Sequence, residues 1–103
     1  MKTLSRDQTA AEARAVRMMR ALASPVRFHL VEILAERKDC TASRLAQALS
    51  LAQSSLSEHL GALRDAGLVQ TSGESAAATS RYYCLDPGAV DFLAAYLAGL
   101  GQR

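Results

Sequence analysis

The residues best suited to chemistry lie in one short stretch of the chain, residues 53–67, with the sequence QSSLSEHLGALRDAG. Three leucines recur there at helical spacing and predict one apolar face for a helix over 53–66: Leu56, Leu60 and Leu63. Three polar side chains then project from the other faces: Gln53, Ser54 and Ser57. A glutamine amide pairs with the edge of adenine, and serine hydroxyls contact bases or phosphates. This pattern is typical of a helix that reads DNA.

The residues just before this helix predict a shorter helix and a tight turn. Thr41 is a suitable cap for a helix over 42–49, and Ser50-Leu51 makes the turn. Gly67 suits the left-handed position that ends the 53–66 helix. Two helices joined in this way form a helix-turn-helix element, in which the second helix enters the major groove and the first braces it against the DNA backbone.

Local signals predict three further helices, near residues 10–23, 25–37 and 88–100. Thr9 and Glu12 fit a capping box, and Ser24-Pro25 places a serine cap before a proline at the first helical position. The first helix is expected to bury a stripe of apolar residues: Ala13, Val16, Met19, Leu22 and Ala23. Asp86-Pro87 precedes the last helix.

Residues 68–85 predict two antiparallel strands, Leu68 to Thr71 and Arg81 to Leu85, joined by a small polar tip. The expected fold class is therefore mostly α with a small β-wing (α+β), with five helices and a β-hairpin. The length of 103 residues fits one winged helix-turn-helix domain over residues 1–103.

Composition narrows the function classes. Twelve basic and ten acidic residues give a net charge of +2, so any DNA-binding surface must come from the distribution of charge. No run of 18 apolar residues predicts a membrane span, and the polar N-terminus lacks a signal peptide's apolar stretch, so we expect a cytoplasmic protein. The sequence has no phosphate-binding loop, nucleophile elbow or metal-ligand cluster, so we expect no enzyme.

The last helix predicts a partner subunit. Residues 89–98 carry one charge, Asp91, whereas a terminal helix packed on a monomer should show a polar outer face. A second copy would cover this helix and part of the first, through Val16, Met18, Met19, Val90, Leu93, Tyr96 and Leu97. A two-fold homodimer would also place two reading helices about one DNA turn apart, which suits palindromic double-stranded DNA.

Five motifs in order resemble the ArsR/SmtB-like bacterial repressors: ALASPVR (21–27), LAQAL (45–49), QSSLSEHL (53–60), LRDAGLV (63–69) and RYYCLDP (81–87). The resemblance covers nearly the whole chain. It implies a homodimeric repressor of its own or a neighbouring operon, which leaves its operator when a signal is sensed.

The matched motif implies DNA contacts by Gln53, Ser54, Ser55, Ser57 and His59. Arg44 and Arg64 are expected near phosphates, and Arg81 with the wing tip near the DNA backbone or minor groove. The alternative for His59 is a packed or capping histidine. Glu58 should repel phosphate, so it is either a reader of cytosine or a solvent-facing residue. Ala52 stands where the family often has a serine or threonine cap, a loss worth about 1 kcal/mol of helix stability.

The signal is not named by the sequence. The family's metal sites need more ligands than Cys40 or Asp91 alone provide, so no metal or cofactor is expected. A site shared by Cys40, Cys84 and a partner-subunit ligand is one alternative. A second is a redox switch, in which the segment of Cys40 pairs with the last wing strand and Cys40 and Cys84 meet as cross-strand neighbours. The structural alternative is that Cys40 is a buried hydrophobic residue and Cys84 fills a strand position. A small organic effector, in a cleft between subunits, is a further alternative. A dimerisation module that antagonises a related regulator without binding DNA is the alternative function, favoured by Glu58 and the missing cap.

Overall fold

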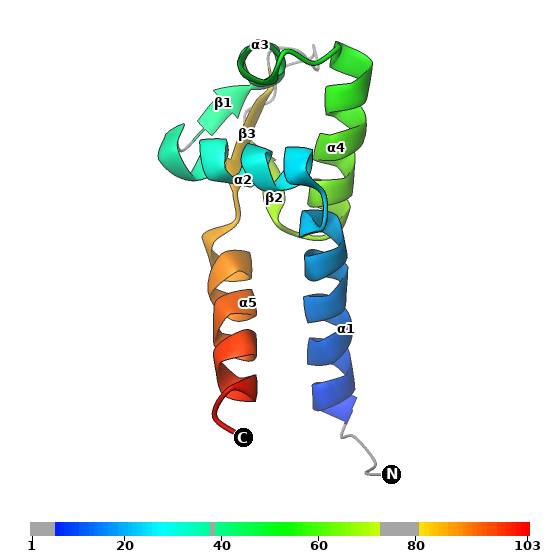
Figure 1. Cartoon of the computed structure of the whole chain (residues 1–103), viewed down its shortest axis with the longest axis vertical. Coiled ribbons are helices and arrows are strands. Elements are labelled where there is room, and N and C mark those ends of the chain that lie inside the picture. Colours follow the sequence, from blue (N-terminus) through cyan, green and yellow to red (C-terminus); the bar gives the residue numbers. More distant parts are fainter. Residues whose placement is uncertain (1–5, 38, 73–80) are drawn as a thin grey trace.

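The computed structural model describes residues 6–37, 39–72 and 81–103. In these residues the chain forms five helices and a three-stranded antiparallel sheet (Figure 1). The helices are α1 (Arg6–Leu22), α2 (Pro25–Arg37), α3 (Ala42–Leu49), α4 (Gln53–Asp65) and α5 (Pro87–Leu100). The strands are β1 (Asp39–Thr41), β2 (Val69–Ser72) and β3 (Tyr82–Leu85). The fold class is the predicted one, with one strand more than the predicted hairpin.

Side-chain caps fix the starts of three helices. Ser24 Oγ accepts a backbone N–H of α2 at 3.4 Å, and Thr41 Oγ1 accepts one of α3 at 3.3 Å. Asp86 does the same for α5 at 3.2 Å. Each cap satisfies an N–H group that the first turn of a helix leaves without a helical partner. The helices α2 and α3 accordingly have their predicted bounds, and α4 ends one residue before its predicted end.

The first helix differs from its prediction in its start and its buried face. It begins at Arg6, so Thr9 lies inside the helix and the predicted capping box is wrong. Its fully buried positions are Ala15 and Met18, whereas Met19 is 38% exposed. The helix therefore meets its neighbours α2, α4 and α5 through one large side chain, Met18, and through small ones such as Ala15 and Ala21.

The sheet has the order β1-β3-β2, with β3 in the middle. Cys40 of β1 lies opposite Tyr83, and both are buried, because residues directly opposite each other share a face of the sheet. Gly67 has a φ of +80°, which lets the chain turn sharply from α4 towards β2. The N–H of Asp86 donates to the carbonyl of Leu68 at 2.9 Å and closes the base of the wing. The predicted wing tip, residues 73–80, lies outside the described residues.

The core lies between the helices and the sheet. Its largest fully buried side chains come mainly from α2, α3 and α4: Met18, Leu30, Leu34, Leu45, Leu56, Leu60, Leu63 and Leu68. A smaller contact joins α1 to α5, where the guanidinium carbon of Arg14 lies 4.1 Å from the centre of the Phe92 ring. The core therefore holds α4 firmly from one side and leaves its other side to solvent.

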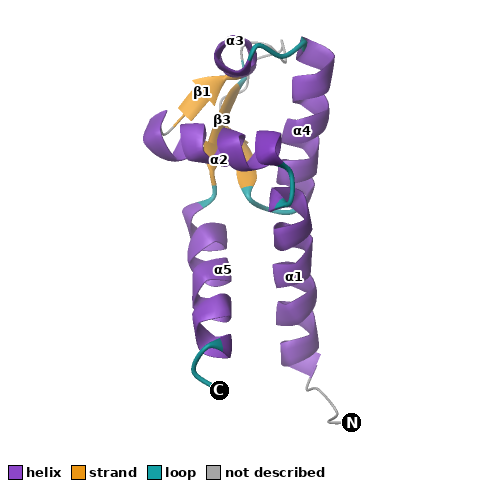
Figure 2. Ribbon diagram, viewed as in Figure 1, coloured by secondary structure: helices purple, strands orange, loops and turns teal. Residues whose placement is uncertain are grey.

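Helices α1 and α5 extend from the rest of the molecule as a two-helix arm (Figure 2). The chain measures 48 × 26 × 22 Å, and its radius of gyration is 15.3 Å. A compact domain of this length has a radius of gyration of about 13 Å. Because two helices cover only one face of each other, the arm leaves apolar side chains exposed.

Candidate nucleic-acid interface

A tight turn orients α4 against α3. Ser50 ends α3 in the left-handed conformation, with a φ of 54°. The N–H of Leu51 donates to the carbonyl of Ala46 at 2.9 Å, which ties the turn to the preceding helix. The turn is thus built by backbone hydrogen bonds, and α4 begins two residues later at Gln53.

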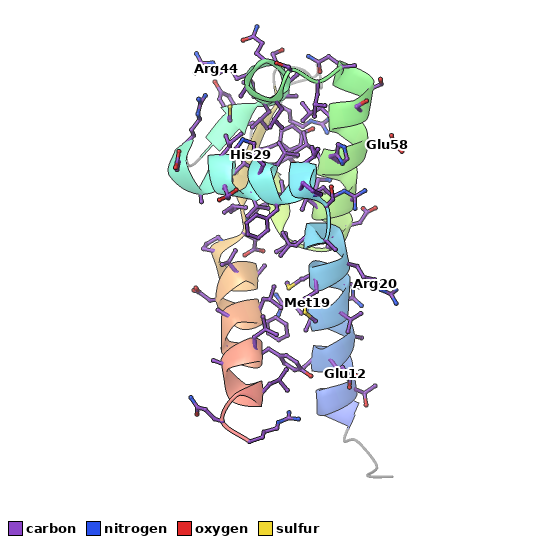
Figure 3. All side chains as sticks on the ribbon, viewed as in Figure 1. Glu12, Met19, Arg20, His29, Arg44 and Glu58 are labelled. Carbon is purple, nitrogen blue, oxygen red and sulfur yellow. The ribbon has the colours of Figure 1, made fainter. Side chains whose placement is uncertain are left out.

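The N-terminal half of α4 presents the predicted polar side chains to solvent. Leu56 and Leu60 are buried, at 0% and 2% exposure, and face the core. Gln53, Ser54, Ser57 and Glu58 are all exposed. Figure 3 shows Glu58 directed away from the core. The exposed face is neither covered by another element nor paired within the described residues, so it can meet the edge of a base.

The first turn of α4 has no side-chain cap. Ala52 has the extended backbone of a cap residue, with φ −66° and ψ 149°, but its methyl group accepts no hydrogen bond. Ala52 therefore offers no side-chain oxygen to the backbone N–H groups of that turn, which lie at the positive end of the helix dipole. Such a helix start suits a phosphate oxygen.

His59 lies on a different side of α4 and has a partner within the chain. Arg27 Nε of α2 donates to His59 Nδ1 at 3.2 Å. Ser55, one turn earlier, is half-buried on the same side of the helix. The structure thus separates these two residues from the exposed Gln53, Ser54 and Ser57, and it gives His59 a packed position like the one that the sequence left as its alternative.

The arginines expected near phosphates are spread around the helix-turn-helix element. Arg44 is exposed on α3 and points away from the core (Figure 3). Arg64 is exposed in the last turn of α4, and Arg81 is half-buried just before β3. Arg37, at the end of α2, was missed by the sequence analysis; it lines the same surface hollow as Arg44. The signal available in the sequence was a basic residue at the end of the helix predicted over 25–37.

The two cysteines do not face each other. Cys84 lies opposite Asp39, and Cys40 lies opposite the neighbouring Tyr83. Because successive residues of a strand point to opposite faces, the two thiols are on different sides of the sheet. Cys40 is buried, whereas the Sγ of Cys84 donates to the carbonyl of Gln70 at 3.7 Å. The predicted cross-strand pairing of the thiols, and the disulfide switch built on it, are therefore wrong.

Metal-binding side chains are scattered over the described residues, where no three His, Cys, Asp or Glu side chains gather as a metal site would require. His29 instead pairs with Glu32 on the exposed surface of α2, with 3.6 Å between Nδ1 and Oε1. No helix among the described residues is both long and apolar enough to cross a bilayer.

The arm carries the residues that were expected to meet a partner subunit. Met19, Val90 and Leu97 are 38%, 40% and 43% exposed. Val16 and Tyr96 are half-buried and line one hollow between α1 and α5. Met18 and Leu93 differ from the others, because at 0% and 9% exposure they belong to the core of the single chain. Leu100, which the sequence analysis did not include, is 43% exposed on the same arm.

The helix-turn-helix of α3 and α4, followed by the strands β2 and β3 of the wing, defines a winged helix-turn-helix regulator. A family model described as "Bacterial regulatory protein, arsR family" matches residues 24–71. A structure described as a possible transcriptional regulator for arsenical resistance is 31% identical, with 82% of each chain covered and a TM-score of 0.68. The chain belongs to the ArsR family and is a DNA-binding transcriptional regulator.

Two further structures are similar over most of their length. Reduced HlyU from Vibrio cholerae is 29% identical, with 87% of this chain and 88% of that chain covered and a TM-score of 0.69. The homodimeric winged helix-turn-helix domain of Mb0332 from Mycobacterium bovis is 23% identical, with 100% and 93% covered and a TM-score of 0.72. The second likeness shows the fold alone. The comparison with curated proteins returns no match.

Proposed function

We propose that the chain is a homodimeric repressor that binds a palindromic operator through the N-terminal half of α4 and leaves it when a signal is sensed. The observation that carries this proposal is the exposed polar face of Gln53, Ser54 and Ser57 on a helix whose opposite face is fully buried. The family resemblance supports repression, because it implies a regulator that occupies an operator until a signal releases it.

The dimer is proposed from the arm. Met19, Val90, Leu97 and Leu100 expose apolar surface on two helices that project from the core. Large apolar side chains exposed together on such an arm mark a candidate interaction surface. A second copy fits best, because its own arm offers the same apolar face and a two-fold axis pairs like with like. Mb0332, which shares the fold, is homodimeric.

The contacts to DNA are proposed in two groups. Gln53, Ser54 and Ser57 contact base edges in the major groove, where a bidentate contact discriminates by about 1–3 kcal/mol. Arg44, Arg64 and Arg81 contact phosphates, together with the uncapped N-terminus of α4. Ser55 and His59 lie on the side of α4 that faces α2, so they support the position of α4 instead of contacting bases.

Fluorescence anisotropy tests the proposal on DNA from upstream of the chain's own gene, with a scrambled duplex as control at the same salt concentration. The expected result is tighter binding to the upstream duplex. Gln53→Ala should lower specific affinity by about 1–3 kcal/mol, whereas Arg44→Gln should weaken both duplexes and reduce the salt slope by about one unit.

A matched control for these variants is Glu36→Gln, since Glu36 is exposed on α2 away from α4. Equal, weak binding to all duplexes by a well-folded dimer would contradict the proposal. That result would favour the dimerisation module that antagonises a related regulator without contacting DNA.

A further inference from the structure

A surface pocket of about 250 Å³ lies where α1, α2 and α4 meet. Its charged lining comes from three helices: Arg17 and Arg20 from α1, Arg27 from α2 and Asp65 from α4. Alanines at 21, 62 and 66 form an apolar floor. Figure 3 shows Arg20 directed away from α5, so this pocket is on a different side of α1 from the arm's hollow between α1 and α5.

The charges of this pocket are unbalanced. Three arginines and one aspartate line it, and in the part of the chain that the structure describes neither Arg17 nor Arg20 forms an ion pair. Like charges that converge on one hollow repel each other, and an anion bound between them would remove that repulsion. Guanidinium groups bind carboxylates with two parallel hydrogen bonds and also stack on flat rings.

We propose that this pocket binds a small organic anion, a carboxylate on a flat apolar body, and that binding lowers the affinity of α4 for DNA. The alanine floor provides apolar contact for the body, and the volume suits a molecule smaller than those in typical ligand pockets. The effect on DNA rests on the proposed function, whereas the binding of the anion does not.

The pocket touches α4 through two residues. Arg27 lines the pocket and also donates its Nε–H to His59 at 3.2 Å. A carboxylate that draws the guanidinium of Arg27 into the pocket strains this link between α2 and α4, since a guanidinium binds an anion more strongly than it binds an imidazole. The same carboxylate repels Asp65, the last residue of α4. Both effects displace α4 from the position that its buried leucines define.

The anion acts at a distance from the reading face. Asp65 and Gln53 are the two ends of α4, about 18 Å apart at the rise of an α-helix. A small molecule beside Asp65 therefore does not cover the exposed face of α4 at Gln53. It changes DNA affinity through its different affinities for two positions of α4, and DNA must weaken anion binding by the same factor.

The experiment is a titration of the ¹⁵N-labelled full chain, followed by backbone NMR shifts, with benzoate as the probe. Benzamide is the neutral control of the same shape, and inorganic phosphate is the control for an unspecific anion site. We expect saturable benzoate shifts at Ala21, Ala62 and Ala66, and none with benzamide. Saturation by phosphate but not benzoate, or by neither, overturns the proposal.

Charge variants sharpen the titration. Arg20→Gln should weaken benzoate binding about fivefold, and Asp65→Asn should tighten it by about threefold, because one removes an attraction and the other a repulsion. Arg37→Gln and Glu36→Gln make the same charge changes at neighbouring exposed positions of α2 outside the pocket, and they should leave binding unchanged. Equal effects of the pocket variants and their controls would contradict a defined site.

A second titration adds saturating benzoate to the anisotropy assay. We expect a loss of DNA affinity of about tenfold, absent in Arg20→Gln. If the chain binds benzoate but its DNA affinity is unchanged, the coupling between pocket and α4 is overturned, whereas the proposed repressor function is not. If the chain binds benzoate but no specific DNA, the anion pocket is supported and the proposed function is overturned.

Discussion

Arg27 on α2 and His59 on α4 are joined by a hydrogen bond of 3.2 Å from Nε to Nδ1. The two residues are 32 positions apart in the sequence, and both are half-buried. Because a guanidinium can only donate, Nδ1 of His59 is the acceptor of this bond. The bond holds the middle of α4 against α2, the helix that begins at Pro25.

A double-mutant cycle measures this link. His59→Ala and Arg27→Gln should each lower the free energy of unfolding by about 1–2 kcal/mol, and the double variant should lose less than the sum. Urea denaturation provides the free energies. His29→Ala is the matched control, since His29 is 57% exposed and pairs only with a surface glutamate, and it should change stability by less than about 0.5 kcal/mol. Additive losses would show that the two side chains act independently.

The helix starts predict stability changes of opposite sign. Ala52→Ser should raise the free energy of unfolding by about 1 kcal/mol, because Ala52 already has a cap backbone and lacks only the acceptor. Thr41→Ala should lower it by a similar amount, because the bond to the N–H of Arg44 is lost. Both are read from urea denaturation midpoints with unchanged slopes. No gain from Ala52→Ser would mean that the first turn of α4 is satisfied in another way.

Local signals predicted much of this fold, and non-local packing explains the errors. Ser24, Thr41 and Gly67 act on their own neighbours, so the helices that they bound could be read from the sequence. The buried face of the first helix was predicted wrongly because the stripe through Val16, Met19 and Leu22 was taken to be its apolar face. Met18 and the alanines meet the core instead, and Met19 remains on the arm.

The register of the sheet and the make-up of the pocket also depend on non-local packing, which the sequence alone does not predict. The pairing of the Cys40 segment with the last strand was anticipated, but a register difference of one residue puts Cys40 and Cys84 on opposite faces. No sequence pattern fixes a register to one residue in strands this short. The pocket joins Arg20, Arg27 and Asp65 from three helices, and only the tertiary structure brings them together.

Oxidation should not join the two cysteines within a native chain. After treatment with diamide, intact-mass measurement should show no internal disulfide, since the thiols lie on opposite faces of the sheet. A maleimide reagent should label Cys84 well before Cys40, which is 4% exposed. Rapid formation of an internal Cys40–Cys84 bond under native conditions would refute the register described above.

Charge on the arm should separate the proposed dimer. Leu97→Asp places a carboxylate at an apolar residue that is 43% exposed, so the folded chain should sediment as a monomer and lose specific DNA binding. Ala98→Asp is the control, because the next residue of a helix points about 100° away. Leu93 is avoided, since its burial in the single chain would confuse unfolding with dissociation. A dimer that tolerates both Leu97→Asp and Val90→Asp would place the interface elsewhere.

The central claim is that two copies of α4, one from each subunit, read DNA about one helical turn apart. Selection from a random duplex pool tests this claim most directly. The wild-type chain should enrich a palindrome whose half-sites are centred about 10–11 base pairs, or one helical turn, apart. Gln53→Ala should enrich the same spacing with relaxed preference at one position of each half-site. Enrichment of a single half-site, or of no sequence at all, by a dimeric and well-folded chain would contradict the account.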